Sequence, residues 1–462
     1  MHQTLSRIAI TVALAAVGTA YAGPSAEQIK QLGATLTPWG AEIAGNKDGT
    51  YPAYTGGMTK PPAGFDGAAG IWVDPYPDDK PVLKITAANV AQYADKLLPS
   101  AQEMIKRYPD TFRVDVYPTR RGYPDMDKFH ADAAIKNASN PECKTAANGV
   151  GLRGCAFSTP FPIPSDGYEV MWNSLLSQRE PMTSMHGRNL VVDANGVLSE
   201  NQYIGFNDVA YWDPKNTPYE GIGLYFYRSV NLTTEPAKDA GTSILIWNPL
   251  RPDVDDPRTW AYTTGQRRVR LAPEFAYDTP ITQLGGVMFF DEANGGFAGR
   301  MDRFDFKLVG KKEMYVPYND YKAIYAPTSA FMPHHLNPDV LRWELRRVWV
   351  VEATLKKGMR HALSKRMFYV DEDSWKTIAA DGYDQAGKLV RMVWSFFIPN
   401  YSGSGGGVND FQSSSLAFDL AVGNWTFVAN AQIPGGYQKI LPRNADYIGK
   451  FNPQAMAGAG VR

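Results

Sequence analysis

The segment Arg346–Leu355, RRVWVVEATL, decides the fold class, because it has the composition of a strand buried on both faces. Side chains alternate between the faces of a strand, so Trp349, Val351, Ala353 and Leu355 share one face. The other face is mainly apolar as well. After the Lys357-Gly358 turn signal, the segment Ser364–Asp373, SKRMFYVDED, has the same character. The two segments are therefore predicted to be neighbouring antiparallel strands.

Working outward, runs with a period of two and rich in Val, Ile, Tyr, Phe and Trp recur from about Gly187 onward. Turn signals at Asn195-Gly196 and Gly387 separate several of them. We predict an antiparallel meander over residues 187–450 and a helix- and loop-rich part over 23–186, together forming a single domain, 23–462. The predicted fold class is mainly β with helices (α+β).

Helix signals are concentrated in the first part. Ser25 precedes AEQIKQLG as an N-cap, and Gly33 is a stop signal. Apolar residues at spacings of three and four between residues 87 and 108 predict one helix, or a pair broken near Pro99. A third helix is predicted to begin at Ser165.

The N-terminus has the features of a secretory signal peptide, residues 1–22. Arg7 gives it a positive charge, an apolar run of about ten residues follows, and Ala20-Tyr21-Ala22 is a small-x-small cleavage site. We expect cleavage after Ala22 and a periplasmic protein without stable membrane insertion. The alternative, a membrane anchor, needs about 20 apolar residues.

Composition excludes further classes. Lys plus Arg and Asp plus Glu are equal at 47, so no excess of positive charge favours nucleic acid as a partner. The only two cysteines, Cys143 and Cys155, flank a Gly-containing loop, which in an exported protein predicts one disulfide.

No motif predicts catalysis, a metal site or a cofactor. The acidic triplet Asp371–Asp373 could supply the paired carboxylates of a glycan hydrolase, but consecutive strand-end residues point to different sides, which favours a turn. The aromatic and aliphatic residues of the strands fill a core or line a ligand cavity. The candidates for a cavity are Trp349, Val351, Ala353, Phe368, Trp394 and Phe396.

Four strings make the chain similar to domain-of-unknown-function family 1329. They are YTTGQRRVRLAPEFAYDTP (262–280), KKEMYVPYN (311–319), LRWELRRVWVVEATLKKGMRHALSKRMFYVDEDSW (341–375) and DGYDQAGKLVRMVW (381–394). Members of this family are exported proteins of Gram-negative bacteria labelled as outer-membrane lipoprotein-sorting proteins.

The resemblance implies a fold like that of the periplasmic lipoprotein carrier and its receptor. Such a fold is a large curved antiparallel sheet, an incomplete barrel, with helices plugging its concave side. It also implies a soluble carrier or chaperone for a hydrophobic ligand or an acylated protein, working beside an inner-membrane exporter and an outer-membrane protein. One alternative is a ligand-free adaptor of a resistance-nodulation-division-type export complex. A secreted glycan-active hydrolase is another.

Overall fold

A computed structural model gives the arrangement of the chain and describes residues 23–66, 71–177, 179–213, 225–273, 275–399, 401, 411–433 and 436–459. The predicted signal peptide, 1–22, lies outside these ranges. Among the described residues, no helix combines the length and the hydropathy needed to cross a membrane.

One sheet of 16 strands organises the described part of the chain. Its order is β1-β2-β12-β13-β14-β15-β16-β17-β5-β6-β7-β8-β9-β10, with β11 beside β12 and β18 beside β5. The pairings are antiparallel apart from the β12–β2 contact. The strands are β1 (Leu83–Ile85), β2 (Val114–Val116), β5 (Met182–Val192), β6 (Leu198–Asp208), β7 (Tyr225–Glu235), β8 (Ser243–Pro249), β9 (Arg258–Thr263), β10 (Arg268–Leu271), β11 (Phe304–Pro317), β12 (Trp343–Leu355), β13 (Lys365–Asp371), β14 (Thr377–Tyr383), β15 (Leu389–Pro399), β16 (Phe411–Asp419), β17 (Asn424–Asn430) and β18 (Tyr437–Ile440).

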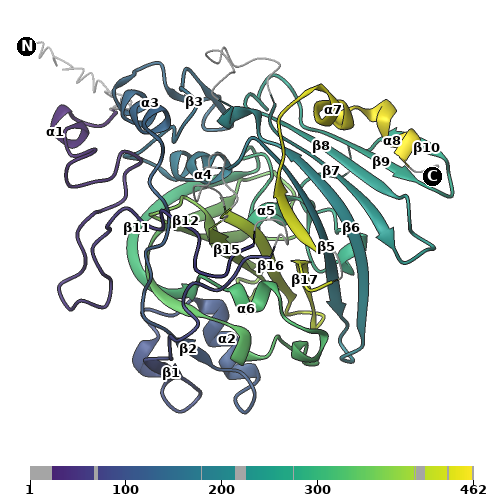
Figure 1. Ribbon diagram of the computed structural model, residues 1–462, viewed down its shortest axis with the longest axis horizontal. Helices are drawn as coiled ribbons and strands as arrows, with labels where there is room; N and C mark the ends of the chain where they lie inside the picture. The colour runs from purple at the N-terminus through teal and green to yellow at the C-terminus, as the bar shows by residue number, and fades with distance from the viewer. Residues whose placement is uncertain are drawn as a thin grey trace, which may run out of the picture.

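The sheet curves without closing into a barrel, as predicted. In Figure 1, β11 and β12 bend along one side, and the long strands β5, β6 and β7 run along the other. The helix α4 (Gly167–Leu175) packs on β11 and β12, α5 (Ala293–Gly296) packs on β14 to β16, and α6 (Tyr321–Ile324) packs on β15 and β17. The predicted plugging helices are therefore present, although two of the three have a single turn.

The remaining α-helices of the described residues lie in the N-terminal third of the chain and near its C-terminal end. They are α1 (Ala26–Ile29), α2 (Pro99–Arg107), α3 (Lys128–Ser139), α7 (Ala445–Ile448) and α8 (Pro453–Ala459). Ser25 caps α1 as predicted. The expected break near Pro99 separates a 3-10 turn, Val90–Tyr93, from α2. The helix α3 was not predicted, since it is short of large apolar residues and is marked only by its Asp127 cap.

The opening segment lies in the centre of the core. β12 pairs with β11 on one side and with β13 on the other, where Val351 lies opposite Phe368. Both of these side chains have no exposed surface. The N-terminal part of the chain adds a further layer, because the Trp375 indole donates to the carbonyl of Trp39 at 2.8 Å. The prediction of two neighbouring, doubly covered strands is confirmed.

The structure also allows a comparison with two further predictions, the disulfide and the start of the long strands. Cys143 and Cys155 form the expected disulfide, beside the separate hairpin of β3 (Lys144–Ala146) and β4 (Gly151–Arg153). The long strands begin at Met182, slightly before the predicted start at Gly187, and β1 and β2 from the helix-rich part join the same sheet. The two parts of the sequence thus share one sheet.

Candidate functional site

The acidic triplet is buried in an ion network. Asp371, Glu372 and Asp373 have no exposed surface. The Arg346 guanidinium, also fully buried, lies 3.1 Å from an Asp371 oxygen and 2.7 Å from an Asp373 oxygen. Burial is the largest effect on the pKa of Glu372, which is raised to about 7 although nearby Lys311 lowers it.

The geometry of this network is that of a structural clamp. Arg121 also binds Asp373 and donates to the carbonyl of Glu42, so the network ties the N-terminal segment to the ends of β12 and β13. The triplet does form a turn, as predicted, but a turn that is wholly enclosed. Because all three carboxylates are fully buried, they do not line an open cleft of the kind that a glycan hydrolase needs.

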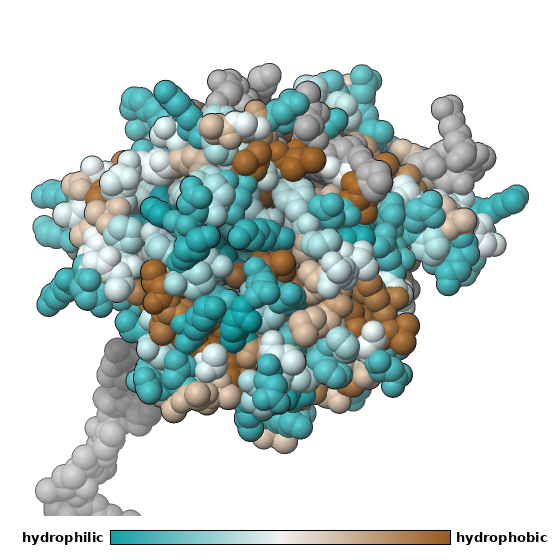
Figure 2. All heavy atoms as spheres, turned by 60° about the horizontal axis from the view of Figure 1, so that its bottom comes forward, coloured by the Kyte–Doolittle hydropathy of each residue, from teal (hydrophilic) through white to brown (hydrophobic). Residues whose placement is uncertain are grey.

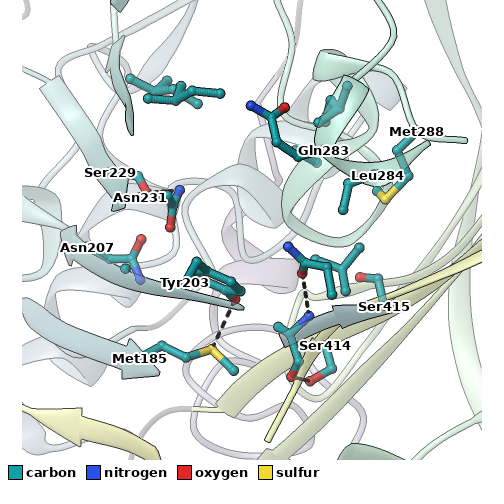
Figure 3. Close-up of a pocket in the computed structure, with 18 of the residues that line it drawn as sticks. Met185, Tyr203, Asn207, Ser229, Asn231, Gln283, Leu284, Met288, Ser414 and Ser415 are labelled. Atoms are coloured by element: carbon teal, nitrogen blue, oxygen red, sulfur yellow. Dashed lines mark hydrogen bonds between the residues drawn. The ribbon is translucent and has the colours of Figure 1, made fainter. Parts of the chain in front are cut away.

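A pocket of about 260 Å³ lies on the side of the sheet formed by β5 to β8, β16 and β17. Figure 3 shows it between two walls, with Tyr203, Asn207, Ser229 and Asn231 on one side and Gln283, Leu284 and Met288 on the other. The lining consists of Arg179, Glu180, Thr183, Met185, Asn189, Asn201, Tyr203, Gly205, Asn207, Val209, Tyr227, Ser229, Asn231, Thr233, Thr242, Ser243, Ile244, Ile246, Ile281, Gln283, Leu284, Met288, Phe290, Ala293, Lys376, Phe397, Ser414, Ser415, Val428 and Ala429.

The sheet wall is built from alternate residues of three neighbouring strands. In register, Thr183 of β5 lies opposite Asn207 of β6, which lies opposite Ser229 of β7. Side chains two residues apart face the same side, so this wall presents rows of amides and hydroxyls. Its further polar members are Asn189, Asn201, Tyr203, Tyr227, Asn231 and Thr233.

Hydrogen bonds hold these polar side chains in place. The Asn189 amide donates to Asn201 at 2.9 Å, and the Tyr227 hydroxyl donates to Asn207 at 2.8 Å. Gly205 leaves room for the neighbouring Asn231, since a Cβ at this position would lie 2.5 Å from the Asn231 Oδ1. Burial raises the pKa of Tyr203 above its ordinary value, so this hydroxyl stays protonated and can donate.

The second wall is the segment 281–293, which lies across the pocket from the sheet wall. It contributes Ile281, Leu284, Met288 and Phe290, and β15 adds Phe397. This wall is mainly apolar, so the pocket has two chemically different sides.

Buried ion pairs fix the second wall to the sheet. Asp291 accepts from Arg366 at 2.8 Å, and Glu292 lies 3.3 Å from Arg391. Burial alone would raise the pKa of Asp291, but Arg366 and His361 lower it, so the carboxylate stays charged. The segment is therefore anchored, which makes the pocket a preformed feature of the fold.

The six predicted cavity residues lie elsewhere. Trp349 is partly buried and stacks on Trp375, with the two ring centroids 5.9 Å apart. The other five, Val351, Ala353, Phe368, Trp394 and Phe396, have no exposed surface and belong to the main hydrophobic core.

The structure does not bring these six side chains together. The registers from β12 to β15 place Phe368 on the same sheet face as Val393 and Phe397, where Phe297 packs on it with ring centroids 5.4 Å apart. Trp394 and Phe396 occupy the opposite face. None of the six lines the pocket, whereas Phe397, the next residue after Phe396, does.

The residues that do line the pocket carry a weak signal in the sequence. In β6, NQYIGFND, Asn201, Tyr203, Gly205 and Asn207 alternate with other residues. Such a pattern is also typical of a strand with one solvated face, so it does not by itself reveal a pocket.

Comparison with known proteins gives a consistent family assignment. The family described as "Protein of unknown function (DUF1329)" matches residues 84–457. A curated relative from Pseudomonas aeruginosa, "Uncharacterized protein PA3922", is 39% identical over 381 residues, which are 80% of this chain and 81% of the relative.

Solved structures were also matched. A DUF1329 family protein from Desulfovibrio piger is 15% identical, with a TM-score of 0.40 over 60% of this chain and 92% of that protein. The LolA superfamily protein NE2245 from Nitrosomonas europaea is 12% identical, with a TM-score of 0.36 over 63% of this chain and 98% of that protein.

Proposed function

The chain belongs to the DUF1329 family, and we propose that it is a periplasmic carrier that holds a hydrophobic or amphiphilic ligand in the pocket between β5–β8 and the segment 281–293. The observation that carries this proposal is the pocket itself. Its apolar wall can cover a ligand chain, and its amide and hydroxyl wall can bind polar groups of the same ligand.

The anchoring of the second wall supports a binding role. Because Asp291 and Glu292 fix the segment 281–293 through buried arginines, the pocket needs little ordering before a ligand enters. Export by the signal peptide would place the protein between the two membranes. There we propose that it receives its ligand, or an acylated protein, from an inner-membrane exporter and passes it to an outer-membrane partner.

The alternative of a ligand-free adaptor requires a docking surface. Figure 2 shows that, on the face it presents, hydrophobic areas are separated by hydrophilic side chains. The large apolar side chains that are most exposed come from distant parts of the chain, among them Val82, Phe129, Val254 and Val422. These observations favour the pocket as the place of binding.

The test combines ligand detection with a variant that fills the pocket. Protein purified from exporting cells is analysed by native mass spectrometry, and uptake of a fluorescent fatty acid is then measured for the wild type and for Ser229→Trp. Ser229 is 3% exposed and lines the pocket, so an indole at this position occupies ligand space. The matched control is Ser199→Trp, because Ser199 is an exposed residue at the start of β6.

We expect a bound small molecule or fluorescent uptake in the wild type and in Ser199→Trp, and a loss of uptake of at least about tenfold in Ser229→Trp. Circular dichroism checks that both variants are folded. A clean mass for the protein alone, together with no uptake by the wild type, would contradict the carrier proposal and favour an adaptor.

A further inference from the structure

Arg179 differs from the other arginines near the pocket. Arg188 pairs with Glu200 at 2.9 Å, and Arg366 and Arg391 pair with Asp291 and Glu292. Among the described residues, no carboxylate pairs with Arg179. Its guanidinium lies over the Tyr227 ring, whose centroid is 5.6 Å from the guanidinium carbon. Its Nε is buried and has no hydrogen-bond partner among the described residues.

The position of Arg179 is set by the fold. It is separated from β5 only by Glu180 and Pro181, and the amide of Val209, which follows β6, donates to the carbonyl of Pro181 at 2.8 Å. Tyr227, the ring beneath the guanidinium, is itself held by the hydrogen bond from its hydroxyl to Asn207. The guanidinium is thus placed at the lining of the pocket by three neighbouring strands.

The charges of the lining residues indicate the sign of the charge that a ligand would carry. Three of the lining residues are charged, Arg179, Glu180 and Lys376, and they leave one positive charge. Glu180 and Lys376 each have further interactions in the protein. Arg179 is therefore the charged lining residue for which the described residues supply no anionic partner.

We propose that the ligand of this pocket is an amphiphile with one acidic headgroup, a carboxylate or a phosphate, and that this headgroup binds Arg179. This inference rests on the proposed carrier function. A guanidinium presents several donors in a planar fork that matches the oxygens of both groups. The polar linker of the ligand lies along Asn207, Ser229 and Asn231, and its apolar chain lies against Leu284 and Met288.

The test measures affinity for three ligands that share one chain. Palmitate, hexadecyl phosphate and hexadecanol displace a fluorescent fatty acid from the wild type, from Arg179→Gln and from the control Arg268→Gln at low ionic strength. Arg268 is an exposed residue of β10 and lies outside the pocket. The two acidic ligands distinguish a fatty acid from a phospholipid-like source.

In the wild type and in Arg268→Gln, we expect at least one acidic ligand to bind about tenfold or more tightly than hexadecanol, a ratio that corresponds to about 1.4 kcal/mol. In Arg179→Gln this preference is lost, while the affinity for hexadecanol is unchanged. Equal binding of acids and alcohol by the wild type, or a preference that survives in Arg179→Gln, would overturn the inference and leave the carrier proposal standing. Absence of binding by all three ligands would refute the carrier proposal itself.

Discussion

Asp381 is a buried carboxyl whose charge opposes folding at neutral pH. It lies in β14, is 1% exposed, and its Oδ1 has no hydrogen-bond partner among the described residues. Burial raises its pKa to about 7 from an ordinary value of 3.8, and hydrogen bonds from Ser100 and Tyr369 only partly oppose this. The folded protein therefore holds a proton that the unfolded chain releases between these two pH values.

The sign and size of the effect follow from this difference. Between pH 3.8 and about 7 the folded state binds more protons than the unfolded state, so the free energy of unfolding falls as pH rises and levels off above about 7. The complete difference corresponds to about 4 kcal/mol, of which about 2 to 3 kcal/mol falls between pH 5 and pH 8. Asp381→Asn removes the titration and keeps the shape of the side chain.

The assay is equilibrium urea unfolding of the wild type and of Asp381→Asn at several pH values between 5 and 8, with the disulfide intact. Other groups, among them Glu372, also titrate here, and the difference between the two proteins isolates Asp381. We expect Asp381→Asn to gain about 2 to 3 kcal/mol relative to the wild type between pH 5 and pH 8. A difference that does not change with pH would show that Asp381 does not hold its proton in the folded state over this range.

Two further predictions concern stability. Arg346→Met leaves Asp371 and Asp373 buried without their main cation, so we expect a loss of about 3 to 5 kcal/mol in urea unfolding at pH 7; a loss below about 1 kcal/mol would show that the network is not a clamp. Replacing Cys143 and Cys155 by Ser opens a loop that spans 12 positions, for which we expect a loss of about 3 kcal/mol, measured by urea unfolding against the wild type under oxidising and reducing conditions. Equal stability of the wild type under the two conditions would contradict this value.

Local patterns were sufficient to predict much of the fold. The alternation of RRVWVVEATL and the Lys357-Gly358 turn identify β12 and β13, because a doubly buried strand needs apolar side chains on both faces. Ser25 and Pro99 mark helix boundaries through capping and the missing amide hydrogen of proline. The buried nature of the acidic turn was not predictable, since its partner Arg121 is 252 positions away from Asp373.

Local sequence patterns could not predict the pocket, for a related reason. Asn201, Tyr203 and Asn207 have the spacing of a solvated strand face, and the segment 281–293 that covers them lies about 80 positions further along the chain. The aromatic residues chosen from the sequence, such as Trp394 and Phe396, fill the core, because α2 and neighbouring strands cover their face; the Trp394 indole donates to Ser100 of α2 at 3.0 Å. Hydrophobic content identified the core but did not reveal the pocket.

Photo-crosslinking can locate a bound ligand chain in the protein. The protein is irradiated with a fatty acid carrying a diazirine on its chain, and the labelled peptides are mapped by mass spectrometry, with excess unlabelled fatty acid as the control for specific binding. We expect labels on residues 182–235 and 281–293, removed by the competitor and by Ser229→Trp. Labels concentrated on β12 and β13, around Trp349 and Phe368, or labels that the competitor does not remove, would contradict this expectation.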